Sequence, residues 1–217
     1  MKKHFELFMV IALVLMFATI STAQEKSESK TTVKWGLGVS SSIFSISSLN
    51  YYIPPYQSTA ISIPIYFSNQ FKIEPFVDYG NYHNENKPGS IYDEKDEFKY
   101  HTITIGSGIF YSKEIIDTRI HFGTNIGYVN QYYYQNYEGG ISSYSTEHKG
   151  NGILIAPSIG CEYFFSNHFS LGSEVRFEWS ELDSDNSQID SMIENKYKSS
   201  TNRFTTSGLV FVRFYFK

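Results

Sequence analysis

Apolar and polar residues alternate along most of the chain from Thr32 onward, which is the pattern of β-strands with one apolar and one polar face. The alternation is clearest in FKIEPFVDYG (71–80), and it recurs in RIHFGTNIGYV (119–129) and FSLGSEVRFEW (169–179). Five further segments follow the pattern less sharply. The sequence therefore predicts eight strands, at about 33–45, 59–67, 71–80, 98–111, 119–129, 152–164, 169–179 and 204–216.

The connections between these predicted strands are alternately long and short. The long ones cover about 47–58, 81–97, 131–150 and 180–202, and the short ones about 68–70, 112–117 and 165–168. This alternation places all long connections at one end of an antiparallel sheet, as in outer-membrane barrels with short periplasmic turns and long extracellular loops. An even strand number lets the first and last strands pair and remove the sheet edges. We predict an all-β fold, an eight-stranded antiparallel transmembrane β-barrel.

The N-terminal segment MKKHFELFMVIALVLMFATISTAQ has the features of a secretory signal peptide. Lys2 and Lys3 precede an apolar run from Leu7 to Ile20, and small residues end at Ala23. An uncleaved anchor is the alternative, but the run is shorter than the roughly 20 apolar residues of a spanning helix. We expect residues 1–23 to be a cleaved signal peptide and residues 24–217 to form one outer-membrane barrel domain.

Composition excludes some partners and cross-links. The net charge is -4, and the chain has no basic run, so nothing indicates nucleic-acid binding. Cys161 is the only cysteine, which excludes an intramolecular disulfide, and it lies too far from the cleavage site to carry an N-terminal lipid. We expect a monomer in contact with outer-membrane lipid.

The polar face of the predicted strands combines glycines with charged residues of both signs. Eight-stranded barrels have narrow interiors in which small residues leave room for large ones. We therefore expect this face to line the lumen and the apolar face to contact lipid. The predicted lumen network consists of Lys72, Glu74, Arg119, His121, Glu162, Glu174, Arg176 and Arg213.

Strand neighbours suggest how this network pairs. Arg119 and His121 should lie near Glu162, and Arg213 should lie near Glu174, because the ends of consecutive antiparallel strands are adjacent. Paired and hydrogen-bonded charges are tolerated in a barrel interior. The alternative is a secreted lipocalin-like barrel, whose apolar face would point inward around a ligand and whose charges would face solvent.

Three segments resemble the small outer-membrane β-barrel domain proteins, a family that includes OmpX-like and OmpA-like barrels. They are the N-terminal segment, IAPSIGCEYFFSNHFSLGSEVRFEW (155–179) and the closing GLVFVRFYFK (208–217). The resemblance spans essentially the whole mature chain. It implies that the last strand is read by the barrel-assembly machinery, although Lys217 departs from the usual terminal aromatic residue. The implied assembly signal consists of Val210, Val212, Phe214 and Phe216.

Members of this family include structural proteins, adhesins, small pores and a few lipid A-modifying enzymes, so the resemblance leaves open whether the chain is an enzyme. His168 and Ser170 have the His-x-Ser spacing of lipid A deacylases, but His168 falls in a short turn, away from the outer leaflet, and has no assignable acidic partner. The DSDNS run (183–187) lacks the glycine of a calcium loop. We expect no catalytic residue, cofactor or metal site.

Tyrosines are concentrated in the long connections. Tyr132 and Tyr133 fit an aromatic belt at the lipid interface, whereas Tyr137 and Tyr144 are candidates for contact with a surface ligand. We expect a structural or surface-interaction role, such as adhesion, through these connections. A small porin-like channel is the alternative, and a lipid A-modifying enzyme comes third.

Overall fold

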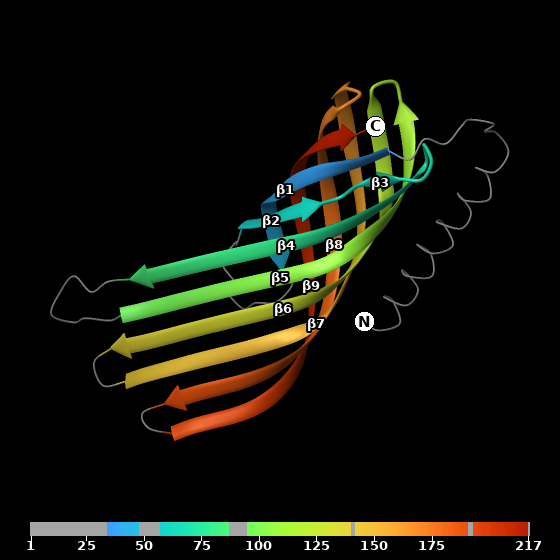
Figure 1. The fold of residues 1–217 in the computed structure, drawn as a ribbon. Coiled ribbons are helices and arrows are strands. Elements are labelled where there is room, and N and C mark those ends of the chain that lie inside the picture. The colour runs from blue at the N-terminus through green and yellow to red at the C-terminus, as the bar shows by residue number, and fades with distance from the viewer. Residues whose placement is uncertain (1–33, 48–56, 87–94, 140–141, 191–192, 217) are drawn as a thin grey trace. The chain divides into compact units, whose positions relative to one another are not determined.

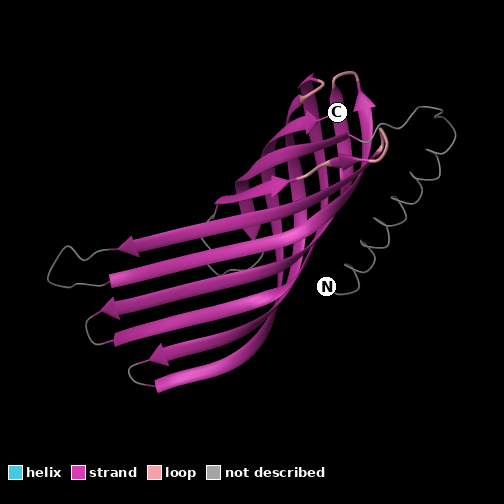
Figure 2. Cartoon of the chain, in the orientation of Figure 1, coloured by secondary structure: helices cyan, strands magenta, loops and turns pink. Residues whose placement is uncertain are grey.

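The computed structural model describes residues 34–47, 57–86, 95–139, 142–190 and 193–216. Within these ranges nearly all residues lie in strands (Figure 2). No helix in the described part of the chain is long and apolar enough to cross a membrane. The predicted signal peptide and Lys217 lie outside the described residues.

The strands form one antiparallel sheet that closes on itself (Figure 1). They are β1 (Lys34–Ser47), β2 (Gln57–Ser62), β3 (Ile65–Tyr66), β4 (Phe71–Asn86), β5 (Lys95–Ile115), β6 (Thr118–Gly139), β7 (Ser142–Ser166), β8 (Phe169–Asp190) and β9 (Ile193–Phe216).

The strands β2 and β3 together occupy one position of the ring, between β1 and β4. They are separated at Ile63 and Pro64, and the nitrogen of Pro64 has no hydrogen to donate to a neighbouring strand. The carbonyl of Pro64 still accepts a hydrogen bond from the backbone nitrogen of Gly36 at 2.9 Å, so β1 stays attached across the break. The ring therefore has eight strand positions, as the sequence predicts.

Closure depends on the pairing of the first strand with the last. β1 and β9 pair from Trp35 with Phe216 to Ser47 with Thr205, with one irregularity between Ser42 and Phe44. This pairing removes the free edges that an open sheet would leave.

The barrel is apolar outside and holds its charged side chains inside, the reverse of a soluble protein. Val77 and Ile105 are 48% and 58% exposed on the outer surface, whereas Lys72 and Glu162 are fully buried. The same parity holds along the other barrel strands, where most exposed large apolar residues lie on the outer face, while the inner face combines charged and polar groups with some aromatic and aliphatic side chains. A lipocalin-like arrangement is excluded, because it would place these apolar residues inside.

The prediction that residues 81–97, 131–150 and 180–202 form irregular loops is wrong. Most of their residues belong to β4–β9, which continue as paired hairpins beyond the last β1–β9 pair (Figure 1). These segments lack the alternation of apolar and polar residues that predicts a strand, because both faces of a hairpin outside lipid can be polar. Of the predicted loop at 47–58, residues 48–56 lie outside the described residues.

The opposite end carries the short turns that the sequence predicts. β5 and β6 are joined by Ile116 and Asp117, and Ile116 has a positive φ of 58°. Asn167 and His168 join β7 to β8. The short turns and the long hairpins therefore lie at opposite ends of the sheet.

Candidate functional site

Glu162 is a buried hydrogen-bond acceptor in the part of the lumen near the short turns. Its carboxylate accepts hydrogen bonds from Ser170 Oγ at 2.5 Å, Tyr215 Oη at 2.5 Å and Tyr66 Oη at 3.2 Å. Arg213 Nη1 donates to the same carboxylate at 3.1 Å. The group is fully buried, and these four donors replace the water that it would otherwise bind.

Arg213 links Glu162 to a second carboxylate. Its Nη2 lies 2.6 Å and 2.8 Å from the two oxygens of Glu74, a close charge-assisted contact. Lys72 Nζ lies 2.5 Å from Glu74 Oε2. The Arg213 guanidinium stacks 3.7 Å above the centre of the Phe211 ring. Two cations and two anions thus form one connected group across the barrel.

Glu174 is the third buried carboxylate. It lies 2.7 Å from Arg176 Nε and 3.3 Å from His121 Nε2, and Asn125 Nδ2 donates to it at 3.4 Å. His121 is fully buried and packs edge-on against the Phe110 ring at 5.4 Å. Aromatic rings therefore fill the space beside the ion pairs.

Arg119 lies at the turn end of the same interior. Its guanidinium lies 4.4 Å from the Tyr66 ring and 4.9 Å from the Phe164 ring, and its Nη2 bonds to Glu114 at 3.0 Å. Arg119 and Glu162 are Cα partners, as the sequence predicts, but Glu162 accepts from other donors.

The structure thus places all eight predicted network residues on the inner face, but it changes several partners. His121 bonds to Glu174 and Arg119 to Glu114, whereas Glu162 was the predicted neighbour of both. Arg213 contacts Glu74 and Glu162 rather than Glu174, which was the predicted partner. The cause is register, since Arg213 lies opposite Ser170 whereas Glu174 lies opposite Leu209. Its partners on the adjacent strands, Gly38 and Ser170, are small and leave Arg213 room to reach across the barrel.

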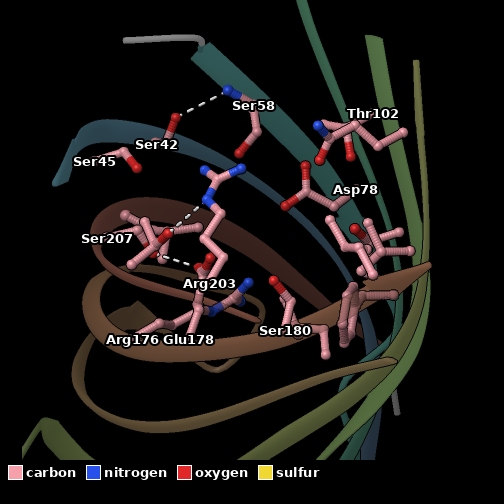
Figure 3. A pocket seen from close by; sticks show the side chains of 18 of the residues that line it. Ser42, Ser45, Ser58, Asp78, Thr102, Arg176, Glu178, Ser180, Arg203 and Ser207 are labelled. Atoms are coloured by element: carbon pink, nitrogen blue, oxygen red, sulfur yellow. Dashed lines mark hydrogen bonds between the residues drawn. The ribbon is translucent and has the colours of Figure 1, made fainter. Parts of the chain in front are cut away.

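A cavity with a mixed polar and apolar lining lies beside this network, toward the hairpin end of the barrel (Figure 3). Asp78 and Glu178 point into it together with Arg176 and Arg203. Hydroxyl side chains line much of the remaining wall, together with Gln131 and the apolar side chains of Phe76, Val129, Leu154, Leu182 and Leu209. Ser207 donates to Glu178 at 2.6 Å. The sequence-based network omitted Arg203, although it shares the inward parity of Arg213 along β9.

The predicted assembly residues all lie on the lipid-facing side of β9. Phe214 packs against Phe169 at 5.1 Å, and Phe216 packs against Trp35 at 4.5 Å across the closing seam. Val210 is exposed. Their recognition by assembly machinery stays a prediction.

The candidate contact tyrosines face each other across the β6–β7 hairpin. Tyr137 and Tyr144 are Cα partners whose rings stack at 5.3 Å with an interplanar angle of 22°. Tyr132 lies on the opposite face, where it stacks with His101 at 6.1 Å. Tyr133 lies on the inner face with Tyr137, opposite to Tyr132. The prediction that Tyr132 and Tyr133 belong to one aromatic belt in contact with lipid is therefore wrong.

His168 and Ser170 contact different groups. His168 Nδ1 contacts the backbone oxygen of Tyr215 at 3.0 Å, whereas Ser170 donates to Glu162. Asp185 lies within β8 and pairs with Lys198 at 3.4 Å. In the described ranges, no group of three or more histidine, cysteine or acidic side chains is placed to hold a metal ion.

Comparison with known proteins shows the fold. No protein family and no curated protein match the sequence. A major outer membrane protein from Thermus thermophilus matches 85% of this chain and 100% of its own, with 8% identity and a TM-score of 0.55. Ail of Yersinia pestis (10% identity, 84% and 98% coverage, TM-score 0.49) and the Neisserial surface protein NspA (15%, 84% and 98%, 0.45) also match. The chain has the fold of small outer-membrane β-barrels.

Proposed function

We propose that this chain is a non-enzymatic protein of the bacterial outer membrane that binds a surface ligand through its extended hairpins. The observation that carries the proposal is the continuation of β4–β9 beyond the last β1–β9 pair, while charged and aromatic side chains block the barrel interior between the cavity and the short turns. A filled interior favours an anchor over a conduit, and it leaves the hairpins as the surface available for interaction.

The outer surface of the barrel supports the membrane location. Its exposed aliphatic and aromatic side chains would be unfavourable in water, but they match a hydrocarbon environment. The aromatic contacts of β9 extend this surface across the closing seam. In this orientation the short turns face the periplasm and the hairpins face outward.

We expect the protein to fractionate with the outer membrane and to migrate on gels in a heat-modifiable way, because a closed barrel resists detergent unfolding until it is heated. The mature chain should begin at Gln24, which mass spectrometry of the purified protein measures directly. Recovery of the protein from the soluble periplasm would contradict the proposed location.

The alternative function, a small channel, predicts ion conductance, whereas the anchor proposal predicts none. Glu74, Glu162 and Arg213 bond across the lumen, so we expect no single-channel steps from the wild-type protein in planar bilayers. A general porin recorded in the same bilayers is the positive control. Reproducible conductance steps from the purified, heat-modifiable protein would reject the anchor proposal in favour of a channel.

A further inference from the structure

The hairpins beyond the barrel form a sheet whose two faces differ in charge. We define the extended sheet as the residues at and beyond the ladder row in which Tyr82, Tyr100, Tyr133, His148, Asn186 and Tyr197 pair in succession. Residues directly opposite in such a ladder share a face, and this row continues the lumen side, where Tyr100 is buried.

Charged side chains of the extended sheet lie mainly on its outer face, where Lys99 bonds to Glu97 at 2.6 Å. This bond raises the pKa of Lys99 and lowers the pKa of Glu97. By ladder parity, the outer face carries Glu85, Lys95, Glu97, Lys99, Glu138, Glu147 and Lys196. Among the described side chains of the extended sheet, Asp96 alone is a charged residue on the inner face.

The inner face instead carries a continuous row of rings. Phe98 lies between Tyr82 and Tyr133, with centroid distances of 5.5 Å and 5.0 Å, and Tyr133 meets His148 at 5.2 Å. These rings are partly exposed, so the row is accessible and is not a closed core. The stacked pair of Tyr137 and Tyr144 extends the row toward the hairpin end.

Neutral hydrogen-bonding groups lie between these rings. Tyr133 Oη donates to Gln135 Oε1 at 2.7 Å, and Gln135 Nε2 donates to Tyr144 Oη at 3.4 Å. Asp96 Oδ1 is buried and has no hydrogen-bond partner among the described residues. Asp96 as a whole is partly exposed, so rotation of its carboxylate would let this oxygen accept a hydrogen bond from a ligand hydroxyl.

We propose that the inner face of the extended sheet binds an uncharged oligosaccharide, a ligand class that rests on the proposed surface-binding function. A sugar ring presents C–H groups that pack on aromatic faces and hydroxyls that bond to amides and carboxylates, which matches rings interspersed with Gln135 and Asp96. An anionic polymer would be repelled by Asp96 on this face. Among the described side chains of the inner face of the extended sheet, no lysine or arginine is present to attract it.

The test uses the full mature chain in lipid nanodiscs, since detergents with sugar headgroups would compete. The probes are maltoheptaose, cellohexaose and mannohexaose, with heparin as the anionic probe. Tyr133→Ala should weaken binding of the preferred neutral probe at least about five-fold through loss of stacking. Tyr134→Ala is the matched control, because Tyr134 lies on the outer face beneath Lys99, and its affinity should stay within about two-fold of wild type.

A second variant guards against misfolding of Tyr133→Ala. Asp96→Asn preserves the shape of the side chain but weakens acceptance from a hydroxyl, so it should also reduce affinity while heat-modifiable migration stays normal. Equal loss in Tyr133→Ala and Tyr134→Ala would overturn the assignment to the inner face.

The remaining outcomes separate the ligand class from the function. Binding of heparin alone, or of a protein alone, would overturn the oligosaccharide proposal and leave a surface-binding role intact. Absence of binding to all three neutral probes by folded wild-type protein would also overturn it. Conductance steps would instead reject the anchor function, independently of any carbohydrate result.

Discussion

Glu162→Ala is expected to destabilise the barrel by about 3–5 kcal/mol, the usual cost of removing one member of a buried charge pair. The substitution removes the acceptor for Arg213 and for the hydroxyls of Tyr66, Ser170 and Tyr215. Arg213 retains Glu74, but the interior gains one net positive charge in a site that excludes bulk water. Urea unfolding of the refolded protein in lipid vesicles measures the loss.

Two variants show whether the charge or the shape of Glu162 matters. Glu162→Gln keeps two polar atoms and should lose less stability than Glu162→Ala. Glu147→Ala removes an exposed ion pair with Lys149 on the hairpins, which should be worth at most about 1 kcal/mol. A urea midpoint of Glu162→Ala equal to that of wild type would contradict the buried network.

The direction of side chains could be predicted from the sequence because lipid and lumen impose opposite requirements on adjacent residues. Val77 is exposed, whereas Glu74, an odd number of positions earlier on the same strand and therefore on the opposite face, is buried, as the alternation indicates. The same requirement places the assembly residues outside and Arg213 inside. Beyond the lipid this requirement ends, so the hairpin residues of β4–β9 gave no comparable signal and were predicted to be loops.

The bonding partners of the charged side chains in the lumen could not be predicted as well as whether each side chain points inward or outward. Pairing register depends on strand tilt and stagger around the closed ring, which local sequence does not specify. Long side chains also cross the barrel to distant strands, as Arg213 does in reaching Glu74 from a position 139 residues away along the chain. The ring row of the extended sheet depends on the same register, because it is assembled from separate strands.

Val212→Arg is expected to impair membrane insertion severely. Val212 lies between Val39 and Leu171 in neighbouring strands, and both of these are exposed on the outer surface of the barrel. An arginine facing lipid near the midplane costs about 2–4 kcal/mol. The unpaired charge would also lie within the closing strand, so assembly of the β1–β9 seam should suffer. The fraction of heat-modifiable protein in the outer membrane measures the effect.

Controls on the same strand separate lipid exposure from a general effect of substitution. Val212→Ile keeps the apolar surface and should insert normally. Ser200→Arg introduces the same charge at an exposed position of β9 beyond the last β1–β9 pair, where water is available, and it should also insert normally. If Val212→Arg inserts as well as Ser200→Arg, Val212 does not face hydrocarbon, and the lipid-facing register of the closing strand would have to be abandoned.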